Sequence, residues 1–293
     1  MLDPIPGFSH HTAEVNGQTI AYSEAGQGEP VLLLHGFPQN RAMWRDVAPG
    51  LARTHHVIAA DLRGYGDSGD PGGGMAGMTF RNMAADQAAL MAHLGHERFH
   101  LVGHDRGART GHRLALDHPE RLLSLTLMDI VPTEFLVRNI TSDAATAYFH
   151  WFYLIQPSPF PETMIQADPD YFFEQCLSGF GAVSLSDFHP EAMETYRHHW
   201  RKPETIAAMC NDYRAALALD VQDDCEDLNR QVPCQSLVLY GEHGVMAKYY
   251  DVPGSWSARL TSMQSQSIPG GHFFIEQSPE ETLAAVSAFL GSL

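Results

Sequence analysis

The sequence predicts an α/β protein with a mostly parallel central sheet that is flanked by helices and interrupted by a helical insertion. Over residues 30–129, and again after residue 235, short apolar runs typical of strands buried on both faces alternate with segments of helical length. Between residues 133 and 230 the chain is rich in aromatic residues, histidine and proline, and no buried-strand pattern recurs. Strands that alternate with helices form a parallel sheet with covered faces. We therefore expect an α/β core at 1–132 and 231–293, with a helical cap at 133–230.

A turn signal and a series of apolar runs predict the strands in chain order. Residues 12–25 are expected to form a hairpin, because Asn16-Gly17 is a strong two-residue turn signal. The run PVLLLHG is continuous, apolar and ends in glycine, as expected for a strand that is covered on both faces. Similar runs predict four further strands, and a last strand is expected in MQSQSIPG, just before His272. These predicted strands cover residues 30–36, 55–61, 98–103, 122–129, 235–241 and 263–270.

The helices of the core follow from apolar stripes and capping signals. One helix is expected at 40–53, and another begins at Thr79, a favourable N-cap ahead of an apolar stripe. A third helix, at 106–117, follows a strand directly. The closing helix is expected to begin at Ser278-Pro279-Glu280-Glu281, which supplies an N-cap, a proline at the first position and a glutamate at the third.

Composition and charge restrict the class of function. The chain has 293 residues and a formal net charge of −17 at pH 7, which argues against nucleic acid or an anionic membrane surface as a partner. We see no signal-peptide pattern at its start and no apolar run long enough to span a membrane. The four cysteines lack a CxxC pair and HExxH is absent, so we expect free thiols in a reducing cytoplasm and no metal site.

The most informative segment is LVGHDRGART at 101–110. Here a buried strand runs into Gly103-His104-Asp105-Arg106-Gly107 and then directly into a helix. Glycines two positions before and two after a central residue permit the sharp turn of a nucleophile elbow, the motif of α/β hydrolases. Serine usually occupies the centre, whereas here it is aspartate. The alternative interpretation is a plain tight turn with a helix-capping aspartate.

An aspartate at this position changes the expected reaction. A carboxylate is a modest nucleophile that suits displacement at saturated carbon, and the product is an ester on the enzyme. A base must then activate water to attack that ester, and histidine is the usual base near neutral pH. His272, in IPGGHFF near the end of the chain, follows a strand and two glycines. Nucleophile first and histidine last is the order found in α/β hydrolases.

The histidine needs an acidic partner that fixes its tautomer and stabilises its cation. Asp129 and Glu242 both stand at the ends of predicted strands. Both positions are used among α/β hydrolases, so spacing alone leaves the choice open. The segment HGFPQN follows the first buried strand, and its Phe37 N–H, together with the Arg106 N–H, is expected to form an oxyanion hole for the second step.

Two arginines follow the predicted nucleophile. Arg106 and Arg109 are three residues apart at the start of the helix that Asp105 begins, so they project on neighbouring faces. A pair of guanidinium groups suits a substrate carboxylate, which arginine binds through two parallel hydrogen bonds. Ion pairing with acidic residues of the core is an equally good interpretation from spacing alone.

Several motifs together resemble those of the fluoroacetate dehalogenases, over nearly the whole chain. The combination of DRGAR with His150-Trp151 and a later DYRA is more specific than HGFP, which epoxide hydrolases and haloalkane dehalogenases share. The motifs are HGFPQN at 35–40, DLRGYGDS at 61–68, GHDRGAR at 103–109, His150-Trp151, CNDYRA at 210–215 and PGGHFF at 269–274.

The resemblance implies roles for these residues. Asp105 matches the family's nucleophile, His272 its base and Asp129 its acid, while Arg106 and Arg109 match its carboxylate clamp. The matches to its halide pocket are His150, Trp151 and Tyr213, which offer an imidazole, an indole N–H and a phenol O–H around a departing anion.

The resemblance also implies a reaction. A small anionic haloacid such as fluoroacetate would lose its halide to give a 2-hydroxy acid, without a metal or organic cofactor, in an enzyme that is a homodimer. One departure is Phe180, where we expect tryptophan, and it bears on the size of the pocket.

Three other functions compete with this one. An epoxide hydrolase would need cap tyrosines, and Tyr148, Tyr153 and Tyr213 are available. The two arginines argue against it, because a neutral epoxide gives them nothing to bind, and the same reason argues against a haloalkane dehalogenase. A catalytically silent binding protein would be expected to lack a member of the triad, yet all three residues are present.

Overall fold

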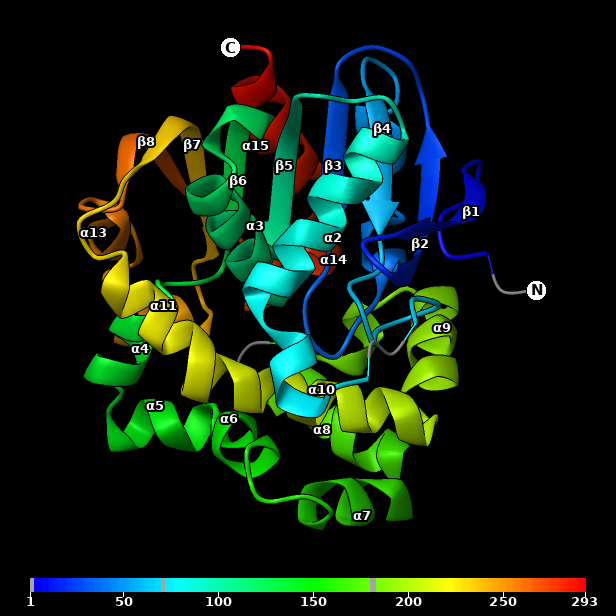
Figure 1. Cartoon of the computed structure of the whole chain (residues 1–293), viewed down its shortest axis with the longest axis vertical. Helices are drawn as coiled ribbons and strands as arrows, with labels where there is room; N and C mark the ends of the chain where they lie inside the picture. Colours follow the sequence, from blue (N-terminus) through cyan, green and yellow to red (C-terminus); the bar gives the residue numbers. More distant parts are fainter. Residues whose placement is uncertain (1–2, 70–71, 180–182) are drawn as a thin grey trace.

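An eight-stranded sheet forms the centre of the computed structural model, which describes residues 3–69, 72–179 and 183–293 (Figure 1). The strand order is β1-β2-β4-β3-β5-β6-β7-β8. The first two strands form the predicted hairpin and β2 pairs antiparallel with β4, whereas every pairing from β4 to β8 is parallel. The strands are β1 (Ser9–Val15), β2 (Gln18–Ala25), β3 (Pro30–Leu34), β4 (His56–Ala60), β5 (Phe99–His104), β6 (Leu122–Met128), β7 (Val232–Gly241) and β8 (Leu260–Ile268).

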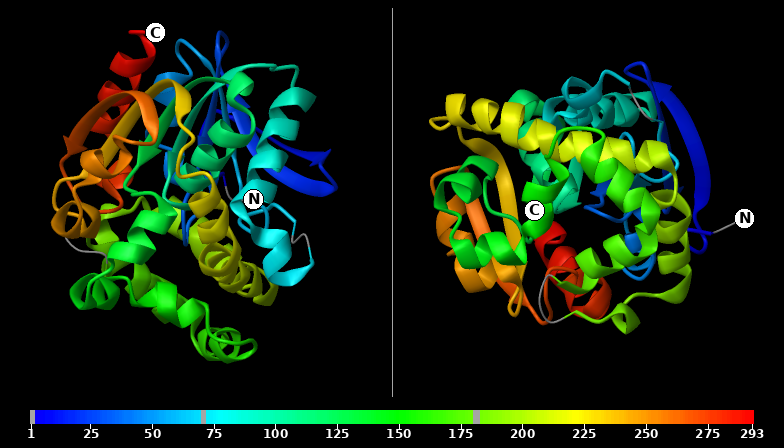
Figure 2. Two further views of the ribbon diagram at one scale, coloured as in Figure 1. Left: turned by 60° about the vertical axis from the view of Figure 1, so that its left-hand side comes forward. Right: turned by 90° about the horizontal axis from the view of Figure 1, so that it is seen from below.

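Helices cover both faces of this sheet (Figures 1 and 2). On one face α2 (Phe80–His93) packs against α3 (Arg106–Asp117), and α3 also contacts β5 and β6. On the other face α15 (Pro279–Leu290) contacts α1 (Ala48–Leu51). Thr79 caps α2 as predicted, since its side chain accepts a hydrogen bond from the Asn82 N–H. Three shorter helices complete the core: α12 (Val245–Tyr249), α13 (Val252–Trp256) and α14 (Phe274–Gln277).

One local prediction is wrong. The helix expected at 40–53 is broken into a 3-10 helix at Arg41–Trp44 and the short α1. The cause is Pro49, which lacks an N–H and clashes with the preceding turn, so it stands in the first turn of a new helix. The closing helix begins as predicted, with Ser278 at the N-cap and Pro279 at the first position, although the Ser278 side chain makes no capping hydrogen bond.

The elements described between β6 and β7 are all helical, and we refer to α4–α11 as the cap. They lie across the carboxyl ends of the parallel strands, below the sheet in Figure 1 and in front of it in the right-hand view of Figure 2. A π-helical turn at Ala216–Asp220 joins the last two. The cap helices are α4 (Thr133–Asn139), α5 (Ser142–Ala147), α6 (Phe149–Leu154), α7 (Phe160–Ala167), α8 (Pro169–Gly179), α9 (Pro190–Trp200), α10 (Pro203–Ala215) and α11 (Val221–Glu226).

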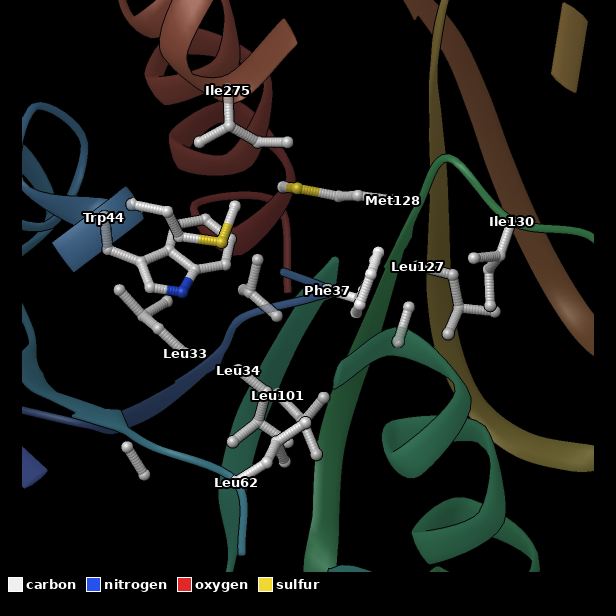
Figure 3. Packing of buried hydrophobic residues seen from close by; sticks show 14 of the residues in the cluster. Leu33, Leu34, Phe37, Trp44, Leu62, Leu101, Leu127, Met128, Ile130 and Ile275 are labelled. Carbon is white, nitrogen blue, oxygen red and sulfur yellow. The ribbon is translucent and has the colours of Figure 1, made fainter. Parts of the chain in front are cut away.

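Apolar packing joins the loop that follows β3 to the cap. The side chain of Phe37, in the loop after β3, is fully buried and is one of the buried apolar residues drawn in Figure 3; its ring centroid lies 5.8 Å from that of Phe173 and 5.0 Å from that of Tyr213. Burying a side chain of this size stabilises the fold by about 1.5–3 kcal/mol. The Phe37 ring therefore joins the loop after β3 to the cap helices α8 and α10.

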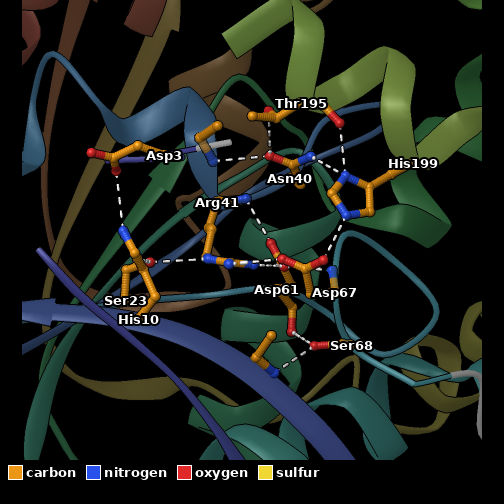
Figure 4. A network of polar contacts seen from close by, with 12 residues as sticks. Asp3, His10, Ser23, Asn40, Arg41, Asp61, Asp67, Ser68, Thr195 and His199 are labelled. Atoms are coloured by element: carbon orange, nitrogen blue, oxygen red, sulfur yellow. Dashed lines mark hydrogen bonds and ion pairs between the residues drawn. The ribbon is translucent and has the colours of Figure 1, made fainter. Parts of the chain in front are cut away.

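A polar network joins the cap to the core on one side (Figure 4). His199 of α9 contacts Asp67 through Nε2 at 2.8 Å and Asn40 through Nδ1 at 3.2 Å. Arg41 pairs with Asp67 at 2.9 Å and also with Asp61. The network holds α9 against the loops that follow β3 and β4. None of the described helices is both long and apolar enough to cross a membrane.

Candidate active site

The turn between β5 and α3 is a nucleophile elbow. Asp105 has φ of 45° and ψ of −112°, a combination that few residues other than glycine adopt without strain. A Cβ atom on Gly107 would lie 2.5 Å from the Leu34 carbonyl oxygen, and one on Gly103 would lie 2.6 Å from the Gly107 backbone. The two glycines thus allow the helix to start directly against the strands, as the sequence spacing predicts.

The Asp105 carboxylate lies close to the loop that follows β3. The Phe37 N–H donates a hydrogen bond to Asp105 Oδ2 at 3.0 Å. Burial by itself raises the pKa of Asp105, but the nearby charges of His272, Arg106 and Arg109 lower it below the usual value. The side chain is therefore ionised at neutral pH, and one of its two oxygens is held by a backbone donor.

The structure brings Asp129, not Glu242, to the histidine. His272 Nδ1 lies 2.6 Å from Asp129 Oδ2, and Asp129 Oδ1 accepts a hydrogen bond from the Gly241 N–H at 2.9 Å. Asp129 is fully buried, whereas the Glu242 side chain is 42% exposed and contacts His243. Burial lowers the pKa of His272, yet the hydrogen bond and charge of Asp129, with the charge of Asp105, raise it above the ordinary value.

The two arginines meet different partners, and ion pairing with an acidic residue, one of the two interpretations left open by the sequence, is observed for Arg106. Arg106 is fully buried and forms an ion pair with Asp212 of α10. Arg109 is also buried, and it donates to the Val131 carbonyl at 3.0 Å and to Thr133 Oγ1 at 2.9 Å. Burial lowers the pKa of both guanidinium groups. For Arg106 the charge of Asp212 outweighs this effect and raises the pKa above its ordinary value, whereas the pKa of Arg109 remains lowered.

Three cap residues predicted to bind halide are gathered beside these groups. The Tyr213 ring lies 5.4 Å from the His150 ring and 5.2 Å from the Trp151 ring, between centroids. His150 also stacks on Phe37, with centroids 5.4 Å apart and planes 4° from parallel. The Arg109 Cζ atom lies 5.1 Å from the Trp151 centroid. Residues from α6 and α10 therefore close over the loop after β3 and the start of α3.

Three residues of this site were not predicted from the sequence. Nothing in the sequence marks Tyr65 as functional, whereas the place of Asp212 in the CNDYRA motif, next to Tyr213, is a signal that could have found it. Tyr65 Oη donates to Asp212 Oδ2 at 2.6 Å. His104 packs on His272 with ring centroids 4.6 Å apart, and its Nε2 lies 2.9 Å from the His272 carbonyl oxygen. Burial and the neighbouring His272 lower the pKa of His104 to about 3, so it is neutral.

Two further expectations concern the pocket and metals. Phe180, where tryptophan was expected, lies outside the described residues. Within residues 3–69, 72–179 and 183–293, we find no group of three or more His, Cys, Asp or Glu that could hold a metal ion.

The fold and the site together define a class of protein. The sheet order, the elbow at Asp105 and the pairing of His272 with Asp129 are those of an α/β hydrolase. The alpha/beta hydrolase fold family matches residues 29–279 of the chain.

Individual relatives narrow this class. The chain is 49% identical to a fluoroacetate dehalogenase from Burkholderia sp over 286 residues, which cover 97% of the chain and 94% of that protein. The chain therefore belongs to the fluoroacetate dehalogenase family of the α/β hydrolases. It is 28% identical to a soluble epoxide hydrolase from Corynebacterium sp. (strain C12), with 98% of each covered. The crystal structure of an alpha/beta hydrolase from Nostoc sp PCC 7120 matches with a TM-score of 0.94 at 45% identity, covering 97% of this chain and 98% of that one.

Proposed function

We propose that this protein removes the halide from a small 2-haloacid, such as fluoroacetate, by hydrolysis through an ester on Asp105. The observation that carries the proposal is a buried cation beside the elbow. Arg109 has two N–H donors, Nε and Nη2, that are buried and have no partner among the described residues. Unpaired buried donors are costly, and a substrate carboxylate would satisfy both.

In the first step, a carboxylate oxygen of Asp105 attacks the α-carbon of the haloacid and the carbon–halogen bond breaks. Because the Phe37 N–H already holds Oδ2, we assign the attack to Oδ1. The new bond is a carbon–Oδ1 ester bond, and the electron pair of the broken bond leaves with the halide. Holding the substrate carboxylate aligns the α-carbon with Oδ1, which contributes through proximity and orientation.

The departing halide would be received by hydrogen-bond donors from the cap. Trp151 offers an indole N–H and Tyr213 a phenol O–H. Burial lowers the pKa of His150 to about 3, so its imidazole is neutral and carries one N–H. A neutral ring donates to the anion without being fixed to it by charge, which favours release of the halide after the step.

In the second step, His272 removes a proton from water and the resulting hydroxide attacks Cγ of the Asp105 ester. The negative charge that develops on Oδ2 is stabilised by the Phe37 N–H and, we propose, by the Arg106 N–H. The Cγ–Oδ1 bond then breaks, the 2-hydroxy acid leaves with Oδ1, and His272 returns its proton to that oxygen. The new carboxyl group of Asp105 loses its remaining proton to solvent, so the carboxylate is restored and one proton is released per turnover. Asp129 orients the His272 ring and stabilises its cation. No metal or organic cofactor takes part in this scheme.

The epoxide hydrolase alternative fits the site less well. It would use the same aspartate and a cap tyrosine, and Tyr148 and Tyr213 lie near the elbow. A neutral epoxide would leave the Nε and Nη2 donors of Arg109 unsatisfied in a buried site, at a cost of about 1–3 kcal/mol. A silent binding protein would have no need for a strained elbow at Asp105.

The reaction is tested with purified protein and a fluoride electrode. We expect fluoride release from fluoroacetate and chloride release from chloroacetate, with glycolate formed in equal amount, and no turnover of styrene oxide. The control is the Asp105→Ala variant, which lacks the attacking oxygen and should release no halide. Turnover of styrene oxide without halide release from either acid would replace the proposal with the epoxide hydrolase alternative.

We also propose that the protein is a cytoplasmic homodimer. The four cysteines are free thiols, which suits a reducing compartment. Five large apolar side chains are exposed on the cap helices α6, α7 and α8, and exposed apolar surface of this kind often marks an interface. A second copy would cover it, since one patch can pair with itself about a twofold axis. The residues are Phe149, Phe152, Phe160, Met164 and Tyr171.

We expect light scattering to give twice the chain mass for the wild type and a single chain mass for a Phe160→Glu/Met164→Glu variant. The variant would bury two carboxylates per copy in the dimer interface, and this burial would oppose dimer formation. A Leu228→Glu variant, altered at an exposed apolar residue outside the patch, is the matched control and should stay dimeric. A monomeric wild type at micromolar concentration would contradict this proposal.

A further inference from the structure

The two site arginines differ in which side of the guanidinium group the protein occupies. The Nε–H and Nη2–H groups of an arginine form its side-on fork, which matches the two oxygens of a carboxylate. In Arg106 both donors of this fork bind Asp212: Nε lies 2.9 Å from Oδ2, and Nη2 bonds Oδ1 and also the backbone carbonyl at 3.0 Å. The Asp212 side chain is fully buried, and Tyr65 donates to it as well. Of the three guanidinium nitrogens of Arg106, only Nη1 has no hydrogen-bond partner among the described residues.

Arg109 has the opposite arrangement. Its Nη1 is fixed by the Val131 carbonyl and the Thr133 hydroxyl. Its side-on fork, Nε and Nη2, is buried and has no hydrogen-bond partner in the part of the chain that the structure describes. The Cζ atoms of Arg106 and Arg109 lie 5.5 and 5.1 Å from the centroid of the same Trp151 ring, so both groups border one region.

We propose that Asp212 makes the carboxylate clamp asymmetric: it occupies the fork of Arg106, so that Arg109 binds the substrate carboxylate through two hydrogen bonds and Arg106 adds one from Nη1. The inference rests on the proposed function for the identity of the substrate. Asp212, on the cap helix α10, is then a positioning residue, because it acts through Arg106 and does not touch the substrate.

The asymmetry has a chemical consequence. With two free forks, a small carboxylate could bind either guanidinium group, and only one orientation would place its α-carbon in line with Asp105 Oδ1. A displacement of the α-carbon by about 1 Å from this position is enough to lower the rate of the first step by about 100-fold. Asp212 removes the competing fork and also compensates the charge of Arg106 while the site is empty. The position of Tyr213, next to Asp212 in the chain, is fixed by the same contact.

Steady-state kinetics on chloroacetate separate this role from a structural one. For Asp212→Asn, which keeps the shape but removes the charge, we expect kcat to fall by about 10- to 100-fold while KM stays unchanged or decreases, because the freed fork of Arg106 binds the acid unproductively. For Arg109→Lys we expect KM to rise by about 10-fold or more, because a lysine cannot replace a two-bond contact. A rise in KM with unchanged kcat in Asp212→Asn would overturn the proposal.

The matched control is Asp86→Asn. Asp86 is also buried and binds the side-on fork of Arg63, with both N–O distances at 2.5 Å, but it lies in α2 outside the site. We expect this variant to lower the melting temperature as Asp212→Asn does, with kcat and KM unchanged. The same split of kcat and KM in both variants would assign the effect to lost stability and overturn the proposal.

A binding measurement makes the test independent of turnover. Acetate should raise the melting temperature of the wild type and of Asp212→Asn, but not of Arg109→Lys, and acetamide, its neutral analogue, should raise none of them. If acetate behaves in this way and no haloacid is dehalogenated, the proposed function fails and the asymmetric clamp stands. If acetate stabilises Arg109→Lys as much as the wild type, the clamp proposal fails whatever the halide assay gives.

Discussion

Replacing His272 with glutamine is expected to stop the reaction after its first step and leave the acid bonded to Asp105. The first step needs only the Asp105 carboxylate and the groups that hold the substrate, so halide release should continue for one turnover. Glutamine cannot accept a proton from water at neutral pH, and turnover should fall by about 10⁴-fold. A chloroacetate-treated sample should gain the mass of one carboxymethyl group in intact-protein mass spectrometry, and peptide mapping should place the group on Asp105.

Two controls make this result specific. The Asp105→Ala/His272→Gln double variant should gain no mass, because the attacking oxygen is gone. His243→Gln, which changes an exposed histidine that contacts Glu242, should keep full turnover. An unmodified Asp105 in the trapped sample, or an adduct on another residue, would contradict the ester mechanism.

Replacing Asp129 with asparagine should lower turnover by about 10³- to 10⁴-fold, because the amide can hold the His272 ring in the wrong tautomer and no longer stabilises its cation. The contact at stake is the 2.6 Å pair between His272 Nδ1 and Asp129 Oδ2. The second step is the one affected, so the ester should accumulate during turnover. Rapid-quench mass spectrometry measures this accumulation.

The pH profile gives the same variant a second readout. The base must be neutral, and the pKa of His272 is raised above its ordinary value, so wild-type activity should be lost as the pH falls through that raised pKa. Asparagine removes both the hydrogen bond to a charged group and the Coulombic attraction, so the pKa should fall and the acid limb should move to lower pH. A Glu242→Gln variant is the control and should leave the limb in place, whereas an unmoved limb in Asp129→Asn would exclude Asp129 as the partner.

Much of the fold could be predicted from local sequence patterns. Buried parallel strands are continuous apolar runs, and each predicted strand of the core corresponds to an observed one within a few residues. The helix at 106–117 has the bounds that were predicted. The error at 40–53 is also local, since Pro49 was present in the sequence as a signal that this helix breaks.

By itself, the sequence determined the elbow at Asp105, the chain order of aspartate and histidine, and the interruption of the core by helices, because each is fixed by residues that are neighbours in the chain. Spacing left the partners of the charged groups open; the family resemblance implied Asp129 as the acid, and the tertiary structure shows which groups meet. Asp129 reaches His272 across 143 positions, and Asp212 reaches Arg106 across 106. Spacing cannot predict such pairs, because a buried ion pair forms where two surfaces meet on folding, and many acidic residues in this chain had the same local signals as the two that are used.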